Sequence, residues 1–323
     1  MANKKNTNIY ILEILTELSD YDHILTTKDI QSILKNRYDI ELNRNAIYSN
    51  IEMLKQAGYD ISDYNDNGKG YYLAKRQFDK GEMLMLCNAI HASHFISSKE
   101  SDRLIKTLLK TQSKYDSKEF TEKVYLPNPQ KVDNKDLMKN IEIISKAIGE
   151  GKMLKFSYMK YDEKRKLVPK REKPYTVEPR YIVYSEAKGY LVATNPKYGE
   201  YTHYRLYKMT NLEILDQNVA PLPINIESYE YARERLFMHH GEVEQILFKV
   251  HEAALDQVID IIGNDYFFIK KEDEYIYFTT KTTKIGAMYL AEYFVEWIEI
   301  IEPKELRIEL QNILKKATNK YKD

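Results

Sequence analysis

The stretch GYLVATNPKYGEYTHYRLYKM, residues 189–209, predicts two β-strands joined by a turn. Aliphatic residues alternate in it with tyrosine, threonine and basic residues, which is the period of two expected for a half-buried strand. A purely structural hairpin needs neither the clustered basic residues His203, Arg205 and Lys208 nor so many tyrosines. The pattern therefore raises the question of what this strand pair holds, and suggests a ligand.

Composition limits the class of protein. A chain of 323 residues predicts about two to four compact units. No apolar run approaches the roughly 20 residues that span a bilayer, and no signal peptide opens the chain, so we expect a cytoplasmic protein without a membrane partner. The single cysteine, Cys87, excludes an internal disulfide and argues against a zinc–thiolate cluster.

No catalytic signature is present in the sequence. A glycine-rich phosphate loop, a Ser-His-Asp set and a paired-acid motif are all missing. Cys87, His91 and His94 lie near one another, but no carboxylate or fourth ligand completes a metal site, so we interpret them as helix packing residues. The sequence predicts a protein that is not an enzyme and has no metal or cofactor.

Charge is unevenly distributed along a chain whose net charge is zero. Residues 152–173 contain nine basic and three acidic residues. Such a local excess attracts phosphates, although a solvated surface loop is the equally acceptable alternative.

Three short helices are predicted at the N-terminus. Apolar residues recur with a helical period over residues 9–18. A second helix begins at TTKDIQSIL, where Thr26 or Thr27 can cap it, and the link NRYDIEL follows. A third helix, NRNAIYSNIEMLKQAG, is capped by Asn43 and ends at Gly58.

A β-hairpin follows the third helix. YDISDY and GYYLA flank NDNGK, in which Asn67 and Gly68 suit a tight turn. Three helices and a hairpin are the pattern of a winged helix-turn-helix, whose third helix enters the DNA major groove. The candidate DNA-binding residues are Arg44, Asn45, Tyr48, Ser49 and Lys55 on the helix and Lys69 on the wing. Because residues 1–76 carry ten basic and eleven acidic groups, a protein-binding helical domain stays open as the alternative.

The rest of the chain changes character twice. Residues 78–112 predict helices, and a polar link containing LPNPQ follows. A helix over 136–150 precedes the strands KMLKFSYMKY and YTVEPRYIVYS, which join the opening strand pair in a bent sheet of about five strands, a small barrel. The last third has the order βαββαβ of a ferredoxin-like unit with one added helix, which Pro303 begins.

This order of segments resembles the WYL-domain transcriptional regulators. The resemblance covers essentially the whole chain, and its matching pieces are KGYYL, KMLKFSYMKY, VEPRYIVYSEAKGYLVATN and HYRLYKM. The triplet for which the family is named is here Gly189, Tyr190 and Leu191, without the tryptophan. In the later family stretch, aromatic-Arg-Leu-Asp-Arg-Ile, this chain keeps the first arginine as Arg205 and has Lys208 in place of the second.

The resemblance implies an α+β multidomain protein. Its expected parts are a winged helix-turn-helix over 1–76, a helical connector over 77–130, an Sm-like WYL barrel over 131–220, and a WCX-like ferredoxin-like domain over 221–323. Family members are bacterial regulators, often homodimers, and some lie beside phage-defence genes. The resemblance therefore implies a homodimeric regulator, a repressor, of a double-stranded DNA operator.

The resemblance also suggests what the opening strand pair holds. The WYL barrel would sense a phosphate-bearing effector, such as nucleic acid or a nucleotide, by tyrosine stacking and basic contacts. The candidate effector-binding residues are Tyr158, Tyr181, Tyr190, His203, Arg205 and Lys208. Strand parity places His203 and Arg205 on one face and Lys208 on the other unless a bulge intervenes. The alternatives are a ligand-independent regulator and an accessory nucleic-acid-binding subunit of a phage-defence or DNA-repair system.

Overall fold

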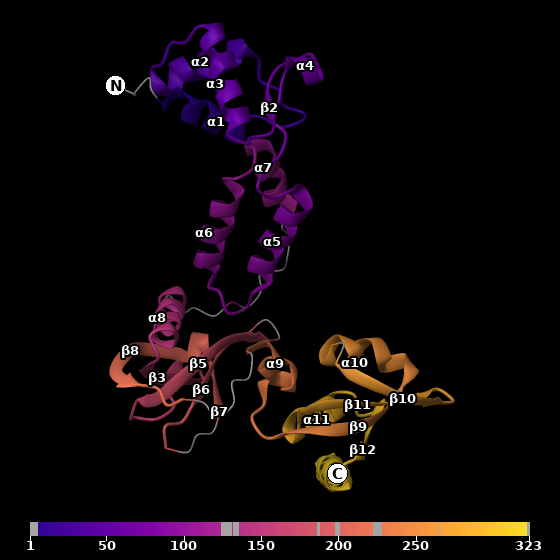
Figure 1. The fold of residues 1–323 in the computed structure, drawn as a ribbon. Coiled ribbons are helices and arrows are strands. Elements are labelled where there is room, and N and C mark those ends of the chain that lie inside the picture. Colours follow the sequence, from indigo (N-terminus) through magenta and orange to yellow (C-terminus); the bar gives the residue numbers. More distant parts are fainter. Residues whose placement is uncertain are drawn as a thin grey trace. The chain divides into compact units, whose positions relative to one another are not determined.

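The chain has two compact units, Met1–Asp133 and Asn134–Asp323 (Figure 1). A computed structural model describes residues 6–123, 131, 136–185, 188–197, 201–221, 228–263 and 265–321. The polar link predicted at 126–130 lies outside the described residues. So do residues 198–200, which belong to the turn predicted within 189–209. The division into four domains stays a prediction.

Three helices open the first unit: α1 (Thr7–Leu18), α2 (Thr27–Tyr38) and α3 (Arg44–Gln56). Their caps are those predicted. Thr26 forms a capping box at the start of α2, and the Asn43 side chain accepts an N–H bond in the first turn of α3. Isoleucines and leucines from all three helices form one buried core, which the helical period predicts. The link predicted from residue 36 begins later, because α2 continues to Tyr38.

The segment after α3 differs from the tight hairpin predicted for NDNGK. Strands β1 (Ile61–Ser62) and β2 (Tyr72–Leu73) do pair antiparallel, but a single helical turn, α4 (Tyr64–Asn67), lies between them. The Asp63 side chain caps this turn in a capping box, and Gly68 ends it with a left-handed φ of 68°. The local capping chemistry therefore outcompetes the two-residue turn.

Three helices follow: α5 (Lys80–Ala92), α6 (Ser98–Leu109) and α7 (Lys114–Lys123). The first two are predicted, whereas α7 is not, because its sequence KYDSKEFTEK has almost no apolar stripe. One aromatic residue supplies the anchor. Phe120 is buried in a small cluster that also contains Cys87, so tertiary packing rather than periodicity holds α7.

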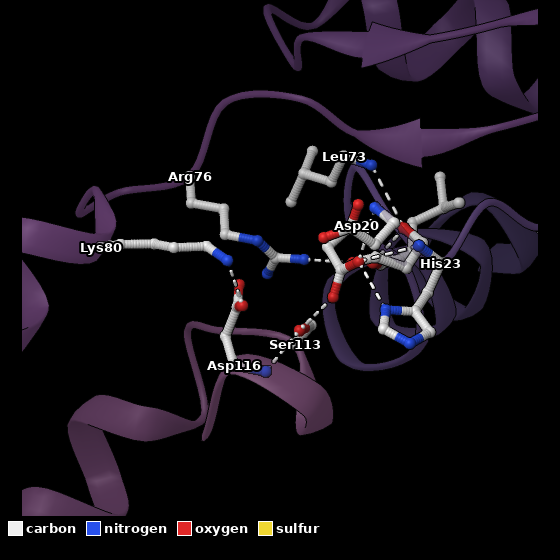
Figure 2. Close-up of polar contacts among 10 residues, drawn as sticks. Asp20, His23, Leu73, Arg76, Lys80, Ser113 and Asp116 are labelled. Carbon is white, nitrogen blue, oxygen red and sulfur yellow. Dashed lines mark hydrogen bonds and ion pairs between the residues drawn. The ribbon is translucent and has the colours of Figure 1, made fainter. Parts of the chain in front are cut away.

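A polar joint binds the first three helices of this unit to the later ones (Figure 2). The Arg76 guanidinium donates to the carbonyl oxygens of Thr16 at 2.9 Å, Ser19 at 2.5 Å and Thr111 at 3.2 Å. Two of these carbonyls belong to the end of α1 and the residue after it, and the third follows α6. The Arg76 side chain thus provides hydrogen-bond donors for carbonyl groups at the C-terminal ends of α1 and α6, which lie far apart in the sequence.

Carboxylates complete the joint. The buried Asp20 accepts hydrogen bonds from the Ser113 hydroxyl at 2.6 Å and from the His23 ring at 2.7 Å (Figure 2). Burial opposes ionisation of Asp20, yet the bonds from Ser113 and His23 hold its pKa below the usual value. An ion pair of 2.6 Å between Lys80 and Asp116 closes the other side.

We expect Arg76→Met to loosen this joint. Leaving three carbonyls without their charged donor should lower the free energy of opening of the α1 end by about 2–4 kcal/mol. Hydrogen–deuterium exchange of α1 and α6 amides measures it. The matched control is Arg37→Met, which removes an exposed pair with Glu17 and should cost under about 1 kcal/mol. Equal exchange in the two variants would contradict the joint.

The second unit begins with α8 (Leu137–Gly149), which packs on a curled antiparallel sheet (Figure 1). Strands β3 (Lys152–Tyr161) and β5 (Tyr175–Ser185) have the predicted bounds. The opening stretch forms β6 (Lys188–Thr194) and β7 (Tyr201–Arg205), which pair with each other as predicted. Buried Asn140 ties α8 to the sheet by donating to the Met209 carbonyl.

Two further strands complete this sheet. A short strand, β4 (Leu167–Pro169), and a long one, β8 (Met209–Asn218), both pair with β3. The sheet runs β4-β3-β5-β6-β7, with β8 also paired to β3. Between β7 and β8 the chain forms a 3-10 turn, η2 (Leu206–Lys208), instead of continuing as a strand. Closure into a small barrel stays a prediction.

The C-terminal part forms a separate four-stranded sheet. Its elements are β9 (Val243–His251), α10 (Leu255–Ile262), β10 (Tyr266–Glu272), β11 (Tyr275–Thr283), α11 (Lys284–Tyr293), β12 (Ile298–Glu302) and α12 (Lys304–Asn319). The strand order is β10-β11-β9-β12 and every pair is antiparallel. The βαββαβ order with one added helix is therefore as predicted.

A short connection precedes β9. It contains α9 (Ser228–Arg233) and the 3-10 turn η3 (Leu236–Met238). The chain as a whole mixes helices and antiparallel sheets, which confirms the mixed α and β class. Among the helices of the described residues, none is both long and apolar enough to cross a membrane.

Candidate nucleic-acid interface and ligand site

The surface of α3 separates sharply into two faces. The buried face consists of Ile47, Ile51 and Leu54. The exposed face carries the predicted set Arg44, Asn45, Tyr48 and Ser49. Because the apolar face fixes the rotation of the helix, these four polar side chains are presented together to solvent.

A depression lies where α2 and α3 begin. Its lining consists of Thr26, Thr27, Lys28, Arg44, Tyr48 and Tyr64. Lys28 and Arg44 are the cations of this lining, and the two helices that start there are capped by the side chains of Thr26 and Asn43. Lys28 and Tyr64 were not singled out by the sequence, because their place beside Arg44 depends on how α2 and α4 pack. The Tyr64 hydroxyl accepts the Thr27 N–H at 3.3 Å.

Lys55 and Lys69, the two other residues predicted to contact DNA, differ in their surroundings. Lys55 forms an ion pair of 2.5 Å with Asp63, the residue that caps α4. Burial opposes its charge, but the contact with Asp63 raises the pKa of Lys55. The structure therefore places Lys55 in a bridge between α3 and α4, away from the exposed set. Lys69 lies exposed just after α4.

Three of the predicted effector residues face the protein itself. Tyr181, Tyr190 and His203 belong to a buried cluster with Tyr231 of α9 and Met238 of η3. The Tyr231 ring is fully buried, 6.4 Å from the Tyr181 ring and 5.6 Å from the His203 ring. The sequence contains no cue that a later segment covers this face. Here the protein's own tyrosine occupies the place predicted for a ligand ring.

His203 is held neutral by this burial. Its Nε2 and the Tyr231 hydroxyl oxygen share a hydrogen bond of 2.7 Å. Burial lowers the pKa of His203 to about 4, although a bond to the Met238 backbone opposes the shift. His203 therefore carries no charge toward a phosphate at neutral pH.

Arg205 lies on the same strand face as His203, as strand parity predicts. Its guanidinium donates to the Tyr207 hydroxyl at 3.2 Å, and its backbone N–H donates to the Tyr158 hydroxyl at 3.1 Å. It pairs across the strands with Tyr190. Burial disfavours its charge, but the hydroxyls of Tyr207 and Tyr190 raise the pKa of Arg205. In the described part of the chain, no carboxylate forms an ion pair with it.

Lys208 and Tyr161 extend this group. Strand parity does not decide the direction of the Lys208 side chain, because Lys208 lies in η2 rather than in a strand. Its Nζ is 5.2 Å from the ring centroid of Tyr161, at the exposed end of β3. Tyr158, by contrast, has its ring packed edge-on against Tyr204 at 5.2 Å, so only its hydroxyl is turned to Arg205. Tyr161 is the accessible aromatic residue that the sequence reasoning missed.

Arg180, a second arginine of the same sheet, differs from Arg205 because an acid neutralises its charge. Arg180 forms a buried ion pair of 2.7 Å with Glu178, and the Thr194 hydroxyl donates to the same carboxylate. Outside the sheet, between α9 and η3, Arg235 is buried over the Tyr231 ring at 3.8 Å, and its Nε has no hydrogen-bond partner. Arg180 is structural, whereas Arg205 keeps a charge that no acid of the described residues offsets.

Comparison with known proteins places a family within this unit. Residues 139–214, from α8 through most of β8, match the WYL domain. This part of the chain is therefore similar to the WYL domain. It contains Arg205, Lys208, Tyr161 and the Tyr231-covered face of β6 and β7. No match exists among curated proteins.

Two solved structures are similar to the chain over nearly its whole length. Proteasome accessory factor B/C (PafBC) of Arthrobacter aurescens is 15% identical, with a TM-score of 0.27 over 99% of this chain and 49% of its own. The chain thus spans about half the length of that protein. A CRISPR Cas-related protein is also 15% identical, with a TM-score of 0.36 over 98% of this chain and 85% of its own.

The buried His203 should make the second unit sensitive to acid. Its folded pKa lies below the unfolded value, so its contribution is full above about pH 6.5 and is lost as pH falls toward about 4. Between about pH 7.5 and about pH 5, the wild type should lose roughly 1–2 kcal/mol more unfolding free energy than His203→Gln. Urea unfolding at both pH values measures this.

The matched control for that measurement is His251→Gln. His251 lies on the C-terminal sheet and contacts Glu274 at 3.3 Å. It should keep most of the wild-type difference between the two pH values. If His203→Gln keeps it as well, His203 is not the group that titrates.

Proposed function

We propose that the chain is a DNA-binding transcriptional regulator, a repressor, that binds a duplex operator as a homodimer. In this proposal the first three helices with β1, α4 and β2 form a winged helix-turn-helix, and α3 reads the major groove. The WYL domain, an Sm-like barrel, binds a phosphate-bearing effector, and the C-terminal sheet is the WCX-like extension. The chain acts in the cytoplasm of a bacterium and catalyses no reaction.

The exposed face of α3 carries the DNA-binding part of the proposal. Arginine suits guanine and asparagine suits adenine, while serine and tyrosine suit phosphates. The depression at the starts of α2 and α3, whose cations are Lys28 and Arg44, adds a place for a backbone phosphate. The slight acid excess of residues 1–76 does not oppose DNA binding by α3, because acids such as Asp63 and Asp20 form a helix cap and part of the joint with Arg76.

Operator binding tests α3. An operator is first selected from random duplexes with the wild-type protein. Arg44→Ala should then weaken binding by about 1–3 kcal/mol, and Arg44→Ala with Asn45→Ala by more, because two base contacts are lost. Fluorescence anisotropy at fixed salt measures affinity, and the titration end point should give two chains per operator.

The matched control removes the same two residue types from the end of α2. It is the double variant Asn36→Ala with Arg37→Ala, and it should bind the operator like the wild type. Equal affinity of both double variants would remove α3 as the reader. One chain per operator would remove the homodimer.

The Arg205 group carries the effector part of the proposal. A half-buried guanidinium whose partners are hydroxyls can exchange them for a phosphate with little loss. Lys208 adds a second cation, and the exposed Tyr161 ring offers a surface on which a base can stack. These residues form a smaller and more accessible group than the six that the sequence predicts.

Arg205→Ala should abolish effector binding without changing operator affinity. Calorimetry with nucleotides and short single-stranded oligonucleotides measures the first, and anisotropy with the selected operator the second. Arg233→Ala is the control, since Arg233 pairs with Asp265 at 2.9 Å. If wild type and Arg205→Ala bind every such ligand alike, or neither binds any, Arg205 is not an effector contact.

A ligand-independent regulator is the second candidate, and one observation favours it. Tyr231 already fills the face formed by Tyr190 and His203, so the WYL domain has a complete core without a ligand. Operator binding without any effector in the calorimetric series would support this candidate. A role as accessory nucleic-acid-binding subunit in phage defence or DNA repair would show as duplex binding without a selectable operator.

A further inference from the structure

The basic segment 152–173 separates into a paired and an unpaired half. Two lysines at the start of β3 are neutralised across the sheet. Lys152 pairs with Asp216 at 2.8 Å and Lys155 with Glu213 at 2.9 Å, both on β8. These cations belong to the sheet's own ion pairs and attract little else.

The unpaired half is a β-hairpin formed by the end of β3 and by β4. Met159 pairs with Pro169 and Tyr161 with Leu167, so the two strands are in register up to the turn. Cations crowd the hairpin and the residue after it, and each is exposed and without an ion-pair partner among the described residues. They are Lys160, Lys164, Arg165, Lys166 and Lys170.

An acid of the hairpin itself builds the turn and keeps its own charge. The Asp162 carboxylate accepts the backbone N–H groups of Lys164 at 3.0 Å and Lys166 at 2.7 Å, which builds the turn. Arg165 has a left-handed φ of 60°, as the same turn requires. Asp162 therefore shapes the tip, and Glu163 is the single other acid between β3 and β4.

We propose that this hairpin is a second nucleic-acid contact, which holds the phosphate backbone irrespective of sequence. A row of unpaired cations on a fixed hairpin suits the evenly spaced charges of a polynucleotide. The tip contains Asp162, Glu163, Lys164 and Arg165, without an apolar residue to enter a lipid layer. The proposal deepens the proposed function and rests on it, since Tyr161 at the end of β3 belongs both to this hairpin and to the Arg205 group.

The test removes four of these cations from the full-length protein. The hairpin variant keeps the left-handed turn because asparagine tolerates it. It combines Lys164→Gln, Arg165→Asn, Lys166→Gln and Lys170→Gln. The probes are a labelled oligothymidine and a labelled duplex without the operator, and anisotropy is measured over a range of salt concentrations.

The matched control removes the same number of charges from another exposed surface. Four lysines on α12 and just beyond it are exposed and have no ion-pair partner among the described residues. The control variant combines Lys304→Gln, Lys315→Gln, Lys316→Gln and Lys320→Gln. Both variants therefore have the same net charge, and any difference between them comes from where the charge was removed.

We expect the hairpin variant to bind both probes at least about ten-fold more weakly at moderate salt, and the control to stay within about two-fold of wild type. The salt slope on the single strand should fall by roughly 3, since each lost phosphate contact removes about 0.7. The hairpin variant should still prefer the selected operator over a duplex without it. This preference distinguishes the hairpin from α3, whose variants should lose it.

Two outcomes overturn the proposal. In the first, the hairpin and control variants bind the oligonucleotides equally. In the second, the hairpin variant keeps oligonucleotide binding but loses binding to phosphatidylserine vesicles, which would make the hairpin a membrane contact. Circular dichroism of both variants checks that the fold is intact.

Discussion

The first unit depends on one guanidinium. Arg76 donates to carbonyls at the ends of two separate helical segments, and its burial lowers its pKa while Asp116 and Asp20 oppose that shift. Buried carbonyls without donors are costly, so this one side chain makes the packing of α1 against the later helices possible. The three N-terminal helices and α5 to α7 belong to one compact unit, and Arg76 is one of the side chains that join them.

In the second unit, two arginines of one sheet, Arg180 and Arg205, differ in their acceptors. Arg180 has the Glu178 carboxylate and is structural. Arg205 has only tyrosine hydroxyls, which satisfy hydrogen bonds without cancelling charge. A charge that is held but not neutralised is what an anionic ligand requires, and this distinction separates the two arginines more clearly than burial does.

Local signals made much of this fold predictable. Thr26 and Asn43 mark helix starts that the structure has, and the period of two gave the bounds of β3 and β5. The misses involve competition or distance. A capping box at Asp63 replaced a tight turn, and α7 is held by Phe120 rather than by its own pattern.

The candidate site was harder to predict than the fold. Tyr181, Tyr190 and His203 lie on a plausible face, but Tyr231, far along the chain, covers it. Lys55 looked outward on a helical wheel, yet Asp63 from the next element captures it. In both cases the periodicity of the strand or helix predicts the direction of the side chain. Its contact partner comes from another segment, which that periodicity does not reveal.

The unpaired hairpin cations have an electrical consequence for the whole molecule. The chain has 49 basic and 49 acidic residues, so a surplus of positive charge on one hairpin requires a negative surplus elsewhere. The hairpin therefore has a positive local potential although the chain as a whole is neutral, and such a potential attracts polyanions. Added salt screens this attraction beyond a Debye length of about 8 Å at physiological ionic strength, and it therefore slows the encounter with a polyanion.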